Sequence, residues 1–217
     1  MPPRRYRDLL AAGIRPNKHF RIRRGNLENI RHCLLVAPHG GRIEPGTTRI
    51  VLAVTRLHRW AYYCFDGCLL RNNWRKLHIA STSYDVPTLL ELLPRTQFVV
   101  SFHGESNRRE RVIYVGGLYR EGRERLLAAL AVDLRDLDIR VRDATIEIKA
   151  EEIAGLSPRN MTNRGATGQG VQLEFSYGAR QVFVPGLSRR AQKRPVAALG
   201  ILAQSVDRVL LQLTRRL

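Results

Sequence analysis

The sequence has few cysteines, few aromatic residues and no long apolar run. It contains three cysteines in 217 residues, and an odd, small number of cysteines argues against the disulfide framework of small secreted proteins. No apolar run approaches the roughly 18–20 residues that a membrane-spanning helix needs. The first 20 residues are basic but lack a continuous apolar core, so they make a poor signal peptide and we expect a cytoplasmic protein.

Two of the cysteines, Cys64 and Cys68, are separated by three residues. This spacing could hold a metal ion, but the surrounding sequence YYCFDGC is typical of a strand that runs into a turn. We therefore expect reduced, partly buried thiols, and a cysteine-ligated metal is the alternative.

Acidic residues are few compared with basic ones. The chain has 37 basic and 19 acidic residues, a formal net charge of +18, and all but four of the basic residues are arginine. So strong a positive field attracts anionic partners, and arginine binds carboxylates and phosphates through two parallel hydrogen bonds. An acidic polymer and nucleic acid both fit this charge. A compositional excess of arginine on solvent-exposed faces is the third explanation.

Aromatic residues make up only 7% of the chain, which counts against a nucleic-acid-binding protein. RNA-binding modules commonly stack bases on aromatic side chains, and the sequence has no zinc knuckle, no RNP-type aromatic pair and no convincing recognition helix. Nucleic acid binding is therefore the alternative and not the main hypothesis.

The length and the 44% hydrophobic content favour one domain with a sizeable core. Apolar runs typical of strands alternate with segments of helical periodicity, which predicts an α/β fold with a mixed, mostly parallel sheet flanked by helices. The predicted strands are 32–37, 61–65, 76–81, 97–104, 111–117, 145–150 and 170–176. The predicted helices are 50–60 with Thr47 or Thr48 as N-cap, 87–93, 121–132 and an amphipathic C-terminal helix at about 195–215 that starts at Pro195. Residues 1–30 form a basic, weakly patterned segment.

Polar residues lie where several predicted strands end. His39 and His103 each follow an apolar run, Glu44 lies in the loop after the first run, and Glu174 is near the end of a third strand. Ligands bind beyond the carboxyl ends of such strands. Two histidines and a glutamate form a common zinc ligand set, and a further carboxylate can act as general base. The H-x4-E spacing differs from the helical zinc motif because Pro-Gly follows it, and each residue alone also has an ordinary structural explanation.

Several sequence blocks occur in order along the chain. They are APHGGRIEPGTT (37–48), FDG (65–67), LHIASTSYDVP (77–87), VSFHG (100–104), IYVGGL (113–118) and NRGATGQGVQLEFS (163–176). Together they resemble the poly-γ-glutamate hydrolase family, zinc peptidases of phages and bacteria, some of which are labelled phage-related replication proteins. The resemblance runs from about Tyr6 to Arg180.

The resemblance implies a zinc-carboxypeptidase-like (phosphorylase/hydrolase-like) core and a single catalytic domain over residues 1–217. It implies Zn²⁺ as cofactor, with His39, Glu44 and His103 as ligands. It further implies a zinc-bound water that attacks a γ-glutamyl amide, with Glu174 as general base. The alternative within the same chemistry is a different amide substrate, such as a peptide or a cell-wall fragment.

The resemblance also assigns residues to substrate binding. Asn163 and Arg164 resemble the Asn-Arg pair with which zinc carboxypeptidases hold a substrate carboxylate. Arg180 is a further candidate for binding substrate, with a solvent-exposed position as the alternative. His78 is expected to be a core or supporting histidine in a strand. The expected partner is a poly-γ-glutamate-like anionic polymer, without a membrane.

Overall fold

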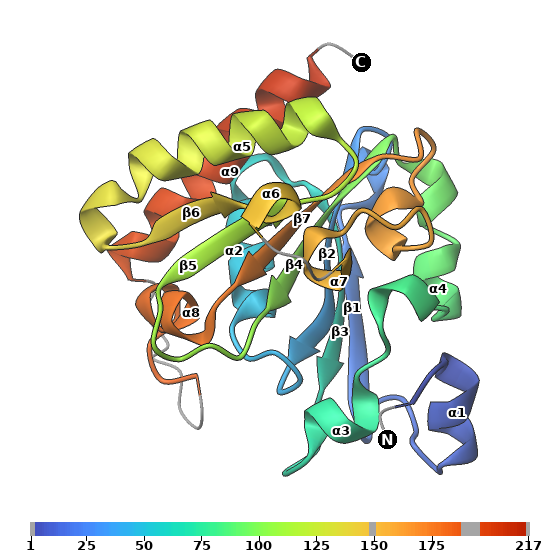
Figure 1. The fold of residues 1–217 in the computed structure, drawn as a ribbon. Coiled ribbons are helices and arrows are strands. Elements are labelled where there is room, and N and C mark those ends of the chain that lie inside the picture. Colours follow the sequence, from blue (N-terminus) through green and yellow to red (C-terminus); the bar gives the residue numbers. More distant parts are fainter. Residues whose placement is uncertain (1–2, 148–150, 188–195, 216–217) are drawn as a thin grey trace.

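The computed structural model of the protein describes residues 3–147, 151–187 and 196–215. A seven-stranded sheet runs through the molecule in the order β1-β3-β2-β4-β7-β5-β6 (Figure 1). Its strands are β1 (Phe20–Gly25), β2 (Cys33–Gly41), β3 (Ala61–Gly67), β4 (Phe98–Gly104), β5 (Val112–Gly116), β6 (Arg140–Asp143) and β7 (Gly170–Phe175). β2 pairs in parallel with β3 and β4, β4 with β7, and β5 with β6, whereas β1 and β5 run antiparallel to β3 and β7. The predicted fold class is confirmed.

Helices cover both faces of the sheet (Figure 1). They are α1 (Tyr6–Ala11), α2 (Thr47–His58), α3 (Asn73–Leu77), α4 (Pro87–Leu90), α5 (Arg120–Asp133), α6 (Ala144–Glu147), α7 (Glu151–Ala154), α8 (Tyr177–Phe183) and α9 (Ala197–Thr214). Alternate residues of a strand point to opposite faces. In β2, Cys33 and Leu35 therefore join the core under α2, α5 and α9, while Leu34 and Val36 join the core under α1 and α4. This explains why the central strands are apolar at nearly every position.

Helix α2 begins and ends differently from the prediction. Its N-cap residue is Gly46, and both threonines lie inside the first turn. Thr47 Oγ1 donates to the carbonyl of Glu44 at 2.9 Å, so this side chain bonds back to the preceding loop. The helix ends at His58 because Arg59 adopts a left-handed conformation, with φ 50°. The predicted threonine N-cap and the extension to residue 60 are therefore wrong.

Two predicted strands are wrong. Within 76–81 the chain completes α3, which is stabilised by hydrogen bonds between the Asn73 side chain and the backbone of Leu69. Within 145–150 the chain forms α6, and Asp143 Oδ1 accepts hydrogen bonds from the backbone and the hydroxyl of Thr145 in its first turn. Residues 148–150 lie outside the described residues. The edge strand expected there is β6, a few residues earlier.

The N-terminal segment is more regular than the sequence analysis predicted, whereas the C-terminal helix is present as predicted. The basic segment 1–30 contains α1 and the edge strand β1, in which Phe20 and Ile22 alternate with arginines. The expected amphipathic C-terminal helix is α9, which packs against α2 and α5, while Pro195 lies outside the described residues. In the described ranges, no helix combines the length and apolarity needed to cross a bilayer.

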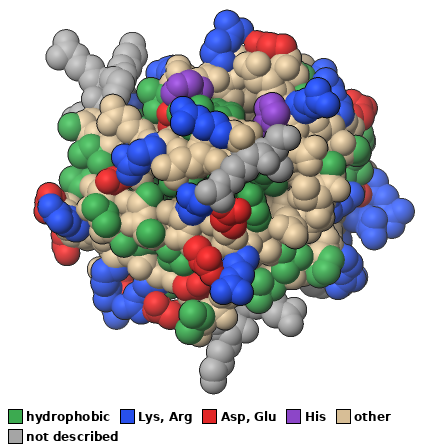
Figure 2. All heavy atoms as spheres, turned by 90° about the horizontal axis from the view of Figure 1, so that it is seen from above, with side chains coloured by type: hydrophobic (Ala, Val, Ile, Leu, Met, Phe, Trp, Pro, Cys, Tyr) green, Lys and Arg blue, Asp and Glu red, His purple; other side chains and the backbone are tan. Residues whose placement is uncertain are grey.

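The cysteines form no disulfide among the described residues, and the basic side chains are dispersed over the face shown in Figure 2. All three cysteines are free, and burial raises the pKa of Cys33 and Cys64. Figure 2 shows Lys and Arg side chains spread over the visible face, with acidic and hydrophobic side chains among them. On this face the basic residues do not gather into one stripe among the described atoms.

Candidate active site

An irregularity in β2 places His39. The pairing of β2 with β3 shifts between Ala37 and Gly40, so β2 carries a β-bulge at Pro38 and His39. Proline has no N–H for a neighbouring strand and occurs inside sheets mainly at bulges, and a bulge redirects the adjacent side chain. The strand therefore continues past the predicted end at residue 37, and His39 lines a cavity at the end of the sheet.

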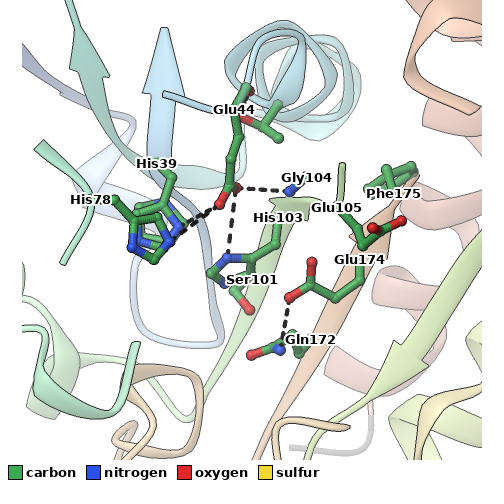
Figure 3. Close-up of polar contacts among 12 residues, drawn as sticks. His39, Glu44, His78, Ser101, His103, Gly104, Glu105, Gln172, Glu174 and Phe175 are labelled. Carbon is green, nitrogen blue, oxygen red and sulfur yellow. Dashed lines mark hydrogen bonds and ion pairs between the residues drawn. The ribbon is translucent and has the colours of Figure 1, made fainter. Parts of the chain in front are cut away.

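The loop after β2 folds back and brings Glu44 to His39. The backbone N–H of Glu44 donates to the carbonyl of His39 at 2.8 Å, and Glu44 Oε2 accepts from the backbone N–H of Gly104 at 2.7 Å (Figure 3). Asp66 supports the loop by accepting from Thr48 Oγ1, which in turn accepts from the N–H of Gly41. His39 and Glu44, five residues apart in the sequence, are therefore brought together by a loop that folds back and not by a helix.

Three imidazoles surround the Glu44 carboxylate (Figure 3). His39 Nδ1 is 2.9 Å from Oε1, His78 Nε2 is 3.6 Å from Oε1, and His103 Nδ1 is 3.8 Å from Oε2. The rings of His39 and His78 stack at a centroid distance of 3.9 Å. Ligand atoms of His39, Glu44 and His78 all lie within 4.8 Å of one another. The structure therefore places all three predicted ligands around one carboxylate, but this tight group among the described residues contains His78 and not His103.

The position of His39 fits a metal cation. Its Nε2 lies 2.8 Å from the carbonyl oxygen of Ile79, and because a carbonyl only accepts, this nitrogen carries the hydrogen. In the neutral ring Nδ1 then has a free lone pair. Nδ1 is buried and has no hydrogen-bond partner among the described residues, although the Glu44 carboxylate faces it. Two lone-pair-bearing atoms this close need a positive charge beside them, which a proton or a metal ion supplies.

Burial and mutual attraction set the charges of Glu44, His39 and His103. Burial alone would lower the pKa of His39 and raise that of Glu44, but their mutual attraction outweighs it, so the pKa of His39 is raised and that of Glu44 is lowered. Burial lowers the pKa of His103 to about 3, so this ring is neutral at pH 7. Ionised carboxylates and neutral imidazoles are the forms that bind metal ions. A metal ion beside Glu44 would therefore take the place of the positive charge that the attraction to Glu44 favours on the His39 ring.

Glu174 lies next to His103, on the neighbouring strand, and lines the same cavity. It is the register partner of His103 between β4 and β7, and it is buried. Gln172 Nε2 donates to Glu174 Oε1 at 3.0 Å, and Asn160 Nδ2 donates to Gln172 Oε1 at 2.9 Å. Burial, together with the negative charges of Glu44 and Glu105, raises the pKa of Glu174 well above its ordinary value. A carboxyl group held in this way is suited to exchange a proton.

Arg180 is buried at the wall of the cavity, so the solvent-exposed alternative is wrong. Three nitrogens of its guanidinium donate to backbone carbonyls: Nη1 to Pro45 at 2.8 Å, Nη2 to Glu105 at 2.8 Å and Nε to Phe175 at 3.2 Å. A side chain on residue 104 would meet this guanidinium, which explains the glycine there. Arg180 therefore ties three segments together and adds positive charge near Glu44 and Glu174.

Asn163 and Arg164 do not line this cavity in the described structure. The Asn163 amide donates to the carbonyls of Gly155 and Ser157, and its oxygen accepts from the N–H of Leu118. Arg164 is exposed and donates to the carbonyl of Tyr84 at 3.0 Å. The predicted substrate role of this pair stays a prediction, and their observed contacts are with the chain itself.

The cavity, of about 610 Å³, has lining residues that the sequence did not single out. Trp74 is 54% exposed and lies 5.1 Å from the His78 ring. The Arg108 guanidinium lies over the Tyr177 ring, 4.5 Å from its centroid. The segment SNRRER (106–111) around Arg108 is basic, but nothing in it indicates which arginine faces the cavity.

Comparisons with known proteins agree on the family of this chain. A family model for poly-gamma-glutamate hydrolase matches residues 5–199. The UPF0714 protein YmaC of Bacillus subtilis (strain 168) is 33% identical over 150 residues, which cover 69% of this chain and 59% of YmaC. The SPbeta prophage-derived UPF0714 protein YoqZ of the same strain is 31% identical over 155 residues, 70% of this chain and 51% of YoqZ. The chain thus spans between 51% and 59% of the length of these relatives.

Two solved structures are similar over almost the whole chain. A bacteriophage poly-gamma-glutamate hydrolase has a TM-score of 0.85 and 26% identity, and the match covers 97% of this chain and 96% of that one. A zinc-free, apo form of YNDL has a TM-score of 0.83 and 24% identity, with 96% of each chain covered. The second likeness concerns the fold alone.

Proposed function

Because the chain belongs to the poly-γ-glutamate hydrolase family, we propose that it is a zinc-dependent hydrolase of γ-glutamyl amide bonds. The observation that carries the proposal is the convergence of His39, Glu44 and His103 with Glu174 on one cavity at the ends of β2, β4 and β7. The similarity to a bacteriophage poly-gamma-glutamate hydrolase supports the reaction class.

His39, Glu44 and His103 would hold the zinc ion. His39 and His103 each direct Nδ1 toward one oxygen of the same carboxylate, and both are buried, whereas the side chain of His78 is 21% exposed. The carbonyl of Ile79 orients His39, and the N–H of Gly104 orients Glu44. When bound, zinc supplies a Lewis acid and lowers the pKa of a coordinated water toward about 7.

Glu174 would move the proton. Its carboxylate accepts the proton of the attacking water and delivers it to the departing amide nitrogen, so that the amine leaves as a neutral group. Gln172 and Asn160 fix its orientation through the hydrogen bonds described above. The raised pKa favours holding the proton between the two transfers. Arg180 adds positive charge beside the carboxylates from a fixed position, because three of its N–H groups donate to backbone carbonyls.

Metal removal tests the proposed reaction. We expect the purified full chain to release new amino groups from poly-γ-glutamate, to stop when a chelator removes the metal, and to recover when zinc is restored, because the bound zinc would supply the Lewis acid and the activated water. Magnesium added in place of zinc serves as the control, since it prefers oxygen ligands. Turnover that persists after the metal has been removed would contradict the zinc proposal.

The net charge of +18 leads to a prediction about salt. If the field gathers a polyanionic substrate, kcat/KM for long poly-γ-glutamate should fall as salt rises, because the screening length shortens to about 8 Å at physiological ionic strength. A short γ-glutamyl oligomer carries fewer charges and should be less sensitive. Kinetics with both substrates over a salt series measure this. Equal, shallow slopes of kcat/KM against salt for the two substrates would indicate that the arginine excess plays no role in substrate capture.

The same charge keeps nucleic acid as a second candidate partner. Binding of DNA or RNA to the basic surface should fall steeply with salt, since it releases counterions, and should survive chelation. Hydrolysis of the polymer should not survive it. Measuring both on one preparation therefore separates the two functions.

A further inference from the structure

Arg108 is a second arginine at the cavity, and it differs from Arg180 in what its donors do. Three nitrogens of Arg180 are engaged by backbone carbonyls. Arg108 is exposed, lines the cavity, and forms no ion pair with any residue that the structure describes. Among the described residues, the Arg108 guanidinium thus keeps all its donors for a ligand, whereas Arg180 uses three of its five N–H donors within the chain.

The backbone around Arg108 is held by local hydrogen bonds. Glu105 Oε1 accepts from the N–H of Asn107 at 2.8 Å, and Asn107 Oδ1 accepts from the N–H groups of Arg109 and Glu110 at 2.9 and 3.2 Å. The N–H of Gly178 in α8 donates to the carbonyl of Asn107 at 3.2 Å. These bonds fix the chain on both sides of Arg108 and dock it against α8.

Tyr177 provides a platform for the guanidinium. Its ring lies 4.5 Å from Arg108 Cζ and 5.6 Å from Arg180 Cζ, and its hydroxyl accepts from Gln181 Nε2 at 3.0 Å. A guanidinium stacked on a ring keeps its edge free for two parallel hydrogen bonds to a carboxylate. Lysine has the charge but not this planar fork.

Three carboxyl groups also line the cavity, those of Glu44, Glu105 and Glu174. A carboxylate whose charge no cation compensates repels an anionic substrate. A γ-linked glutamyl chain carries one free α-carboxylate per residue beside each amide bond. Such a chain approaches these carboxyl groups more readily when a cation at the same cavity donates hydrogen bonds to one of the chain's own α-carboxylates.

We propose that Arg108, stacked on Tyr177, binds a free α-carboxylate of the γ-glutamyl substrate and so determines specificity for chains that carry one. This inference rests on the proposed function. It makes Arg108 a specificity-determining residue, while the zinc ligands and Glu174 carry the reaction.

The test compares Arg108→Ala and Arg108→Lys with Arg109→Ala, which removes a neighbouring exposed arginine that does not line the cavity. With a γ-glutamyl oligomer, KM should rise roughly 10- to 100-fold in Arg108→Ala, as expected for a lost charge-assisted hydrogen bond. kcat and zinc content should change little. Arg108→Lys should recover only part of the loss, and Arg109→Ala should behave as wild type.

A modified substrate identifies the group that Arg108 binds. When the α-carboxylates of the oligomer are converted to methyl esters, the KM of wild type should rise by the same factor as the Arg108→Ala substitution causes with the free acid. The KM of Arg108→Ala should not rise further on the ester. Equal KM values for Arg108→Ala and Arg109→Ala on the free acid would overturn the proposal. If wild type shows no turnover, the proposed function fails, but calorimetric titration with the oligomer still tests the role of Arg108. Binding that is lost only in Arg108→Ala supports this role. Binding that is equal in wild type and Arg108→Ala, or absent from both, overturns it.

Discussion

Replacing His39 by alanine is expected to remove stoichiometric zinc and, with it, hydrolysis. His39 lies 2.9 Å from Glu44, its ring is oriented by the Ile79 carbonyl, and its Nδ1 is buried without a hydrogen-bond partner among the described residues. Loss of one of three protein ligands should cost more affinity than the roughly 10- to 100-fold typical of a residue that only supports a ligand. Elemental analysis of the purified variant measures the effect without relying on activity.

The same measurement decides between His103 and His78 as the third ligand. We expect His103→Ala to lose zinc as His39→Ala does, and His78→Ala to keep it or to bind it no more than about 100-fold more weakly. His32→Ala is the matched control, because His32 is exposed and does not line the cavity. Zinc retained in His103→Ala and lost in His78→Ala would assign the third ligand to His78, whose Nε2 is 3.6 Å from Glu44.

Replacing Glu174 by glutamine is expected to lower kcat by roughly 10²–10⁴ while zinc content and thermal stability stay close to wild type. An amide cannot accept the proton of the attacking water, and loss of a general base typically costs this much. Glutamine has nearly the same shape, and its amide oxygen can accept the hydrogen bond that Gln172 donates to Oε1. Single-turnover kinetics on the zinc-loaded protein report the chemical step directly.

The comparison variant for Glu174 is Glu105→Gln. Glu105 also lines the cavity, and its Oε1 accepts from the N–H of Asn107, a bond that glutamine can keep. The rate loss in Glu105→Gln should be much smaller, because no proton transfer is assigned to it. Near-normal turnover of zinc-loaded Glu174→Gln would place the base elsewhere in the cavity.

The sequence by itself determined the layered α/β fold. The apolar run of β2 alternates between two cores, and only a central strand of a covered sheet needs apolar residues at nearly every position. It also predicted that His39, His103 and Glu174 lie at strand ends, and parallel pairing of those strands then brings them to one edge. The ordered sequence blocks identified the family, which the match over residues 5–199 confirms.

Local patterns failed where side-chain hydrogen bonds to the backbone override them. Residues 76–81 and 145–150 have apolar positions that suit a strand, yet α3 and α6 form there because Asn73 and Asp143 bond to nearby backbone groups. Hydrophobic periodicity does not report such bonds, since they depend on single polar atoms.

Only the tertiary structure decided what each functional side chain meets. The bulge at Pro38 depends on pairing with β3, and it redirects His39. His78 reaches Glu44 because α3 ends there and the following chain supplies the Ile79 carbonyl to His39. Arg180 is buried because three carbonyls from separate segments surround it. Contacts between atoms far apart in the chain leave no periodic signal, so charge and spacing alone did not distinguish the buried Arg180 from the exposed Arg108, whose guanidinium forms no ion pair with a described residue.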